Sequence, residues 1–140
     1  MREFKSATGK TFLTINFDSK NNLIYNNWIG YASSENIMQG ATSFLEVLQE
    51  TNCASTITDN SEFVGPWENS IEWLCENWIP SARAAGLKFY AHIANKGSFA
   101  DEAARKLANC VESAFEMKVF ESLMDAQEWI KSKTQVTVTV

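Results

Sequence analysis

Apolar residues alternate with polar ones in some stretches of the chain and recur every three or four positions in others. Residues 11–17 alternate and predict a strand. Residues 18–22 have the composition of a turn, and residues 23–32 predict a return strand. The N-terminal part of the chain is therefore expected to form a β-hairpin.

Stretches with helical spacing separate the later strands. Ser33 or Ser34 suits the N-cap of a helix that runs to about residue 50. Pro66 suits the first turn of a second helix, which Pro80 should kink or restart and Gly86 should end. The other predicted elements are strands at 54–58, 87–94 and 115–120 and helices that begin near Ser98 and Ser122.

This order predicts an α/β domain with a mostly parallel central sheet, an N-terminal antiparallel hairpin and about four helices. The chain has 140 residues, the size of one domain, and we expect a core at about residues 10–132 followed by a tail, 133–140. Residues 135–140, QVTVTV, have strong β character. We expect either a frayed terminus or a strand added to a neighbouring sheet edge, such as that of a second subunit.

Charge and composition narrow the possible partners. The formal net charge is −5 and no cluster of Lys and Arg occurs, which argues against binding to nucleic acid or to anionic membrane surfaces. No apolar stretch approaches the ~20 residues of a membrane span, and no signal peptide is recognisable, so a cytoplasmic location is expected. The three cysteines, Cys53, Cys75 and Cys110, are widely spaced, which favours a reducing compartment over a disulfide framework.

Several segments resemble a known family. Residues 115–120 followed by 122–130, within this element order, resemble the STAS domains, the anti-sigma-factor-antagonist-like family. Residues 58–67, 73–74 and 78–80 resemble a bacterial subgroup of STAS-like proteins more closely. The resemblance covers roughly residues 10–132. It implies a SpoIIAA-like (STAS) fold and a small regulatory or scaffolding module that binds other proteins, and we expect a homodimer.

The resemblance also implies a phosphorylation site. In typical members, a partner kinase phosphorylates a serine that follows the second core strand, at the start of a helix, in an Asp-Ser-Ser/Thr-Gly motif. Ser61 stands at about the corresponding position here. The segment departs from the motif because the glycine is absent, Glu62 follows the serine, and the connection to Pro66 is longer.

The best candidate site is the segment from Asp59 to Trp67, which we expect to be a loop. It leaves the carboxyl end of a core strand, where open α/β sheets place ligands. The alternative is a well-ordered connection whose Asp and Asn satisfy backbone N–H groups. The candidate ligand or partner residues are Asp59, Asn60, Ser61, Glu62, Phe63 and Trp67.

Trp73 suggests a contact surface. At helical spacing it points away from the apolar stripe and shares its face with polar residues. Tryptophan often anchors interfaces, which makes Trp73 a candidate interface residue. The alternative is that its side chain packs on an adjacent loop or on the hairpin.

Three functions remain after this inspection. The first is a non-catalytic STAS-like interaction module without catalytic residues, metal or cofactor, because a single histidine, His92, and isolated glycines give no metal or phosphate motif. The second is a small-molecule or lipid-binding protein. An enzyme is third, and it would need Asp59, Glu62 or His92 to converge in a cleft. The residues that could line an apolar pocket in a carrier are Trp28, Phe63, Trp67 and Trp78.

Overall fold

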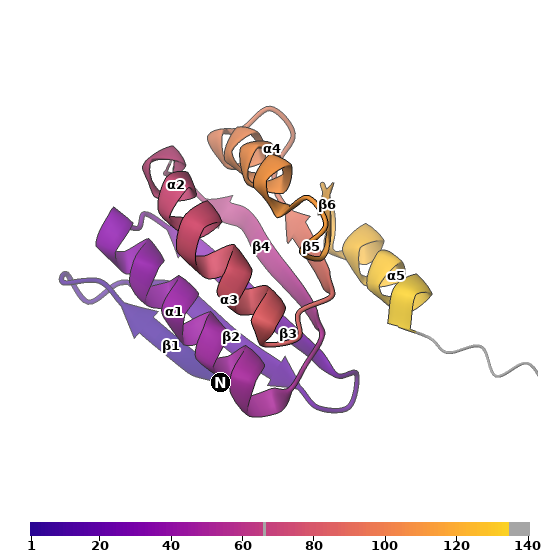
Figure 1. The fold of residues 1–140 in the computed structure, drawn as a ribbon. Coiled ribbons are helices and arrows are strands. Elements are labelled where there is room, and N and C mark those ends of the chain that lie inside the picture. Colours follow the sequence, from indigo (N-terminus) through magenta and orange to yellow (C-terminus); the bar gives the residue numbers. More distant parts are fainter. Residues whose placement is uncertain (66, 135–140) are drawn as a thin grey trace, which may run out of the picture.

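A six-stranded mixed sheet runs through the molecule, with its strands in the order in which they occur along the chain (Figure 1). The computed structural model describes residues 1–65 and 67–134. The pairs β1–β2 and β2–β3 are antiparallel, and the three later pairs are parallel. The α/β class, the hairpin and the parallel strands are thereby confirmed. The strands are β1 (Arg2–Lys5), β2 (Thr11–Asp18), β3 (Leu23–Gly30), β4 (Ser55–Phe63), β5 (Phe89–Ile93) and β6 (Glu116–Phe120).

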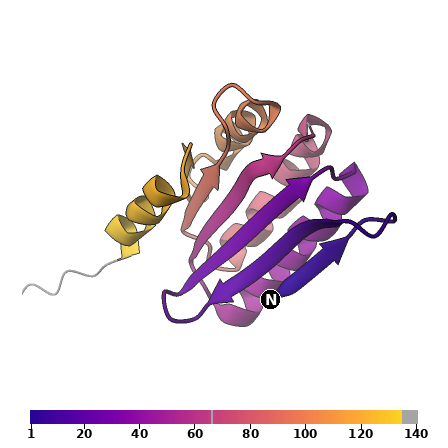
Figure 2. The ribbon, with the colours of Figure 1, turned by 180° about the vertical axis from the view of Figure 1, so that it is seen from behind.

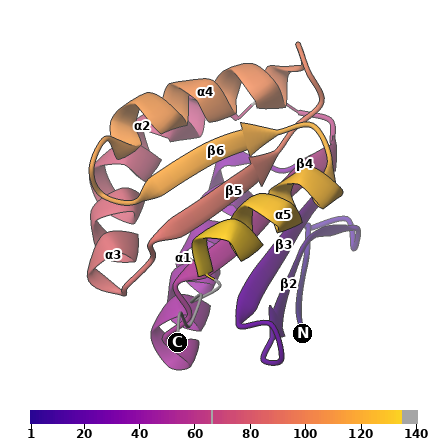
Figure 3. The same cartoon turned by 90° about the vertical axis from the view of Figure 1, so that its right-hand side faces the viewer.

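The helices divide unequally between the two faces of the sheet (Figure 3). The inner face is covered by α1 (Ser34–Thr51), by a helical segment that contains α2 (Ile71–Trp73) and α3 (Ile79–Ala84), and by α4 (Phe99–Val111). These are the connections between parallel strands. Right-handed crossovers that always proceed in one direction place every connecting helix on the same face. Of the helices in the described residues, only α5 (Leu123–Thr134), which follows the last strand, lies on the outer face.

Two apolar clusters hold these layers together. The larger lies between the inner face and α1, α3 and α4, and it includes Leu13, Ile24, Leu48 and Trp78. The smaller lies between the outer face and α5. Figure 2 shows that the outer side of β1–β3 carries no helix. The smaller cluster consists of Ile57, Ala91, Ile93, Ala126 and Ile130, with partly buried neighbours around it.

The helix N-caps expected from the sequence are present. Ser33 caps α1, since its side chain accepts from the Asn36 N–H while the Asn36 side chain accepts from the Ser33 N–H. Ser98 caps α4 and accepts from the Asp101 N–H. Ser122 accepts from the Asp125 N–H at the start of α5. Each cap satisfies a backbone donor that the first helical turn leaves free.

Two strands differ from the sequence prediction. β1 was not expected, and its pairing with β2 extends the sheet to residue 2. Its four residues carry little pattern of their own, and Arg2 is tied to Glu50 of α1 at 2.6 and 2.8 Å. β4 does not end at residue 58 but continues to Phe63, so residues 59–62 are not a loop. Pairing with both β3 and β5 keeps this polar segment extended as far as Asp59, and β3 alone does so to Phe63.

The segment between β4 and β5 is an irregular helix. A 3-10 turn (Glu68–Ser70) precedes α2, and a π-helical turn (Leu74–Trp78) joins α2 to α3. The Ile79 N–H donates to the Leu74 carbonyl, five residues back. Proline lacks an N–H and its ring clashes with the carbonyl four residues earlier, so the wider turn before Pro80 accommodates it. The distortion of the helix that Pro80 was expected to cause therefore takes the form of a π turn.

Gly40 permits close contact between α1 and the sheet. A Cβ at this buried position would lie 2.5 Å from Cη2 of Trp28 and 2.7 Å from Cδ2 of Leu13. We expect Gly40→Ala to lower the free energy of unfolding by about 1–3 kcal/mol, since overpacking outweighs the gain in helix propensity of roughly 0.5–1 kcal/mol. Urea denaturation would measure the change. Gln39→Ala, at the exposed neighbouring position, is the control and should stay within about 0.5 kcal/mol of the unmodified protein. Equal stability of the two variants would contradict the packing argument.

Candidate functional site

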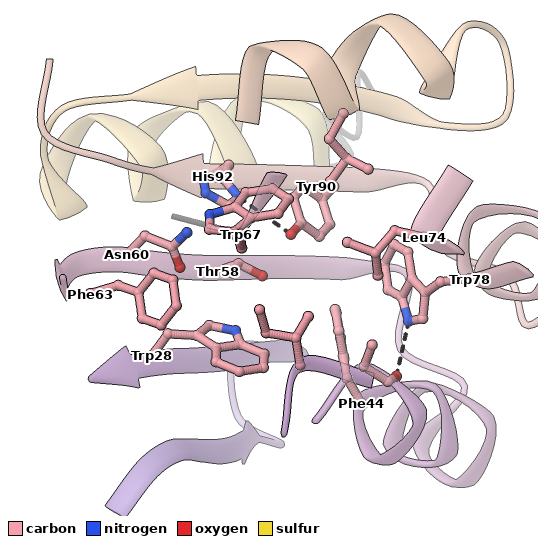
Figure 4. Close-up of a pocket in the computed structure, with 13 residues that line it drawn as sticks. Trp28, Phe44, Thr58, Asn60, Phe63, Trp67, Leu74, Trp78, Tyr90 and His92 are labelled. Atoms are coloured by element: carbon pink, nitrogen blue, oxygen red, sulfur yellow. Dashed lines mark hydrogen bonds between the residues drawn. The ribbon is translucent and has the colours of Figure 1, made fainter. Parts of the chain in front are cut away.

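A pocket lies between the inner face of the sheet and its covering helices (Figure 4). Its volume is about 60 Å³, and it is partly open to solvent. β3, β4 and β5 form the floor, while α1, the π turn, α4 and Trp67 supply the walls. The pocket therefore lies where the crossover helices meet over the centre of the sheet.

Aromatic side chains make up most of the lining. All four residues that the sequence suggested for an apolar pocket, Trp28, Phe63, Trp67 and Trp78, line it. The rings of Trp28 and Phe63 are 6.0 Å apart and meet edge to face. The indole N–H of Trp78 donates to the Ala41 carbonyl at 3.0 Å, which fixes this wall to α1. The aromatic walls are thus packed against one another and held in place.

Three polar atoms in this pocket have no partner. They are Oδ1 of Asn60, Nε1 of Trp67 and Nε2 of His92, and no described residue forms a hydrogen bond with any of them. The three side chains are 4%, 6% and 1% exposed. Figure 4 shows them close together at one end of the pocket. An unpaired buried polar group costs roughly 1–3 kcal/mol, so three in one pocket represent a substantial unmet demand for hydrogen bonds.

His92 is neutral in this setting. Burial lowers the pKa of His92 to about 4, against a smaller opposing effect of Asp59 and Asp101. Its Nδ1 lies 3.3 Å from the hydroxyl of Tyr90, and burial raises the pKa of Tyr90 to about 12. His92 also lies beside the Trp67 indole, with ring centroids 5.8 Å apart. The pocket thus carries no charged lining group at neutral pH.

The predicted site residues divide between the two faces of β4. Asn60, Phe63 and Trp67 line the pocket, whereas Asp59 does not. Successive side chains of a strand point to opposite faces, so Asp59 and Asn60 cannot share one site. Asp59 accepts from the Tyr25 hydroxyl at 2.5 Å on the outer face. Desolvation, with help from this hydrogen bond, raises the pKa of Tyr25.

The catalytic convergence that the enzyme hypothesis required is not found. Asp59 faces away from His92, which lies on the inner face of β5. Glu62 is exposed and accepts from the Asn27 side chain at 3.3 Å. In the described part of the chain, no group of three acidic, histidine or cysteine residues is arranged to hold a metal ion.

Ser61 is exposed but lies within β4. Its N–H donates to Asp59 at 2.9 Å, and its carbonyl accepts from the Asn95 side chain at 3.0 Å. The next helical residue is Glu68, so Ser61 does not occupy the start of a helix as the family motif requires. Phosphorylation of Ser61 stays a prediction.

Trp73 is half-buried and packs against the larger apolar cluster. Its side chain therefore packs at least partly within its own domain, and the alternative of packing on an adjacent loop or on the hairpin stays a prediction. A role in association stays a prediction.

The interpretation of the cysteines was wrong. Cys75 in the π turn and Cys110 in α4 form a disulfide, with their Cα atoms 5.7 Å apart. The packing of these helices brings together two residues that are 35 positions apart in the sequence. Cys53 is buried and its Sγ donates to the Asn22 and Ser55 carbonyls, while burial raises the pKa of its thiol. The cysteine argument for a reducing compartment therefore no longer holds, and a cytoplasmic location stays a prediction.

Sequence reasoning missed Thr58 and Tyr90 as pocket residues. Thr58 on β4 and Tyr90 on β5 share the inner face with Asn60 and His92. Polar residues at alternate positions of two adjacent central strands were the available signal. That signal becomes specific only when the strand register is known.

Comparisons with known proteins give no family assignment. No protein-family model matches this chain, and no curated protein matches it. The STAS resemblance therefore stays a prediction. None of the helices in the described residues has the length and apolar content needed to cross a membrane.

The buried, neutral state of His92 predicts a pH dependence of stability. Between about pH 4 and 6.5 the unfolded chain binds a proton at this residue and the folded chain does not, so stability falls as the pH falls. Relative to His92→Gln, the unmodified protein should lose up to about 1.4 kcal/mol per pH unit in this range. Urea denaturation of both proteins from pH 4 to 8 would measure the difference. The difference should be flat above pH 7, and parallel curves throughout would contradict a neutral His92.

Proposed function

We propose that this protein binds a small neutral molecule in the aromatic pocket and acts through binding rather than catalysis. The observation that supports this proposal best is the set of three buried, unpaired polar atoms on Asn60, Trp67 and His92. A ligand that supplies their hydrogen-bond partners would recover part of the energy that they cost the empty protein. The aromatic walls would supply the apolar contact.

The polar atoms restrict the ligand's chemistry. The Trp67 indole can only donate, so the ligand must present an acceptor to it. The Asn60 Oδ1 can only accept, so the ligand must present a donor to it. An amide or lactam edge carries both groups side by side. We therefore infer a lactam-like or amide-like head group.

Charge and size restrict the ligand further. No pocket residue offers a counter-charge, and burying an unpaired charge is costly. Asp59 and Asp101 lie close enough to affect the pKa of His92, and they disfavour an anion. The pocket volume of about 60 Å³ is small beside the ~300–1,000 Å³ of sites for drug-sized ligands. The ligand should therefore be little larger than the head group itself.

The interaction-module hypothesis is supported by a different region. The edge of the sheet at β6, with which no described strand pairs on its outer side, offers a surface for another chain. A pocket ligand and a protein partner are compatible, because the pocket lies beneath the helices and β6 lies at the sheet edge.

The pocket predicts selective binding of a neutral lactam. We expect 2-pyridone to shift the Trp67 indole N–H signal in a ¹H–¹⁵N NMR titration, whereas benzoate, which is similar in size but anionic, should not. Trp67→Phe keeps an aromatic ring and removes the N–H, and it should weaken 2-pyridone binding about fivefold, the equivalent of one net hydrogen bond.

Trp129→Phe is the matched control, since Trp129 lies with the smaller cluster on the outer face of the sheet. It should leave the affinity for 2-pyridone unchanged. Equal binding of 2-pyridone and benzoate, or no response of the Trp67 signal to either, would overturn the proposed ligand class.

We expect Asn60 to strengthen ligand binding and to lower the free energy of unfolding of the empty protein. Asn60→Leu removes an unpaired buried polar group and keeps the number and branching of the side-chain heavy atoms, so the free energy of unfolding should stay level or rise by up to about 1 kcal/mol. The same substitution should weaken 2-pyridone binding about fivefold. Urea denaturation and the NMR titration would measure the two effects. A variant that is clearly less stable would show that Asn60 is structural.

A further inference from the structure

The two edges of the sheet differ in how well they are protected. β1 forms one edge with four residues, three of them charged, and Arg2 is anchored to Glu50 of α1. Short, charged edge strands resist pairing with other chains. β6 forms the opposite edge, and no described strand pairs with its outer side. The edge at β6 is therefore the one open to strand addition.

A groove runs along this edge. It has a volume of about 340 Å³ and lies between the end of α4, β6 and α5. Val111, Phe115, Met117 and Trp129 supply its apolar lining. Glu112, Glu116 and Lys118 also line it, and the Lys118 ammonium stands over the Phe120 ring, 5.5 Å from the centroid. The groove therefore presents apolar and charged side chains beside a backbone edge with which no described strand pairs.

The backbone of β6 has groups available for a further strand. The Glu116 N–H donates to the Lys88 carbonyl, and the Phe120 carbonyl accepts from the Ala94 N–H, both on the β5 side. Residues of a parallel strand alternate in the neighbour to which they bond. Met117 and Val119 therefore direct their N–H and C=O groups toward the open edge.

We propose that residues 136–140 of a second copy of this chain add to β6 as a seventh strand. These residues lie outside the described part of the structure. Their sequence, VTVTV, alternates valine with threonine and consists entirely of β-branched residues, which suit a strand with one apolar face. Five residues also match the length of β6.

The position of α5 argues that the strand comes from a second copy. Lys133 contacts Glu116 at 2.9 Å, so α5 ends beside the first residue of β6. To pair antiparallel with its own β6, the tail would first have to run the length of that strand, about 16 Å at ~3.3 Å per residue. Six residues are too few to run out and return.

Parallel pairing within one chain is disfavoured by handedness. The connections through α1, α3 and α4 advance across the sheet with their helices on the inner face. A further step in the same direction through α5, on the outer face, would have the opposite hand. About 98% of such crossovers are right-handed, so this connection would be left-handed and rare. Exchange between two copies avoids both problems, since the tail of each enters the groove of the other.

Cysteine cross-linking between separate chains tests the proposal. One chain would carry Lys118→Cys and a second, with a different tag, would carry Val138→Cys or Thr139→Cys. Val138 is the middle residue of the proposed strand and Lys118 is the middle residue of β6. Adjacent positions of a strand face opposite sides, so one of the two should meet position 118 when the strands are centred on each other. Mild oxidation of the mixture should give a covalent dimer with one chain of each kind. In the control, Gln39→Cys, at an exposed position of α1, replaces Lys118→Cys, and no covalent dimer with one chain of each kind should form.

Variants that carry both cysteines in one chain distinguish a strand supplied by the same chain from a strand supplied by a second copy. A disulfide formed only within single chains would overturn the exchange of tails between two copies. The same yield of covalent dimer with the Gln39→Cys control would also overturn it. Val138→Pro should convert the dimer into a monomer by light scattering because proline cannot donate to a strand ladder, while Val138→Thr should keep the dimer. A chain that is monomeric at every concentration, with no cross-link, would also overturn the proposal.

Discussion

The hand of the crossover connections is the constraint on which this structure depends. The four parallel strands are added one after another in a single direction, so right-handed connections place α1, α3 and α4 together on the inner face. This stacking makes one side of the sheet thick and aromatic and leaves the other side to α5. It creates the space in which the pocket lies. It also leaves β6 as the last strand of the series among the described residues, followed by α5 on the opposite face of the sheet.

The pocket shows how this arrangement allows buried polar groups to persist. Central strands packed under helices would normally carry apolar residues on both faces. Here Asn60 and His92 interrupt that pattern on adjacent strands, and neither Oδ1 of Asn60 nor Nε2 of His92 has a hydrogen-bond partner among the described residues. The surrounding apolar cluster supplies enough burial to tolerate the cost, as binding sites commonly require. The disulfide between Cys75 and Cys110 joins the π turn to α4, the two helical elements that contribute Leu74, Trp78 and Leu107 to the pocket wall.

Local patterns predicted most elements, and the reasons for the failures are physical. The serine caps and the alternating strands were recognisable because each depends on residues that lie only a few positions apart in the sequence. The extension of β4 through Asp59–Glu62 was not, because a polar segment reads as a loop unless paired strands hold it extended. β1 was too short to carry a pattern. The pairing of Cys75 with Cys110 depends on how two helices pack, which spacing along the chain does not reveal.

The sequence by itself determined the α/β class, the hairpin, the order of elements and the aromatic residues available to line a pocket. These follow from periodicity and capping, which act over a few residues. Only the tertiary structure decided which residues share the pocket. Strand register sends Asn60 inward and Asp59 outward, and the position of β5 beside β4 brings His92 next to Trp67. The alternation along a strand determines which face a side chain shares with its sequence neighbours. Its contacts on that face come from elements distant in the sequence, so only long-range packing determines them.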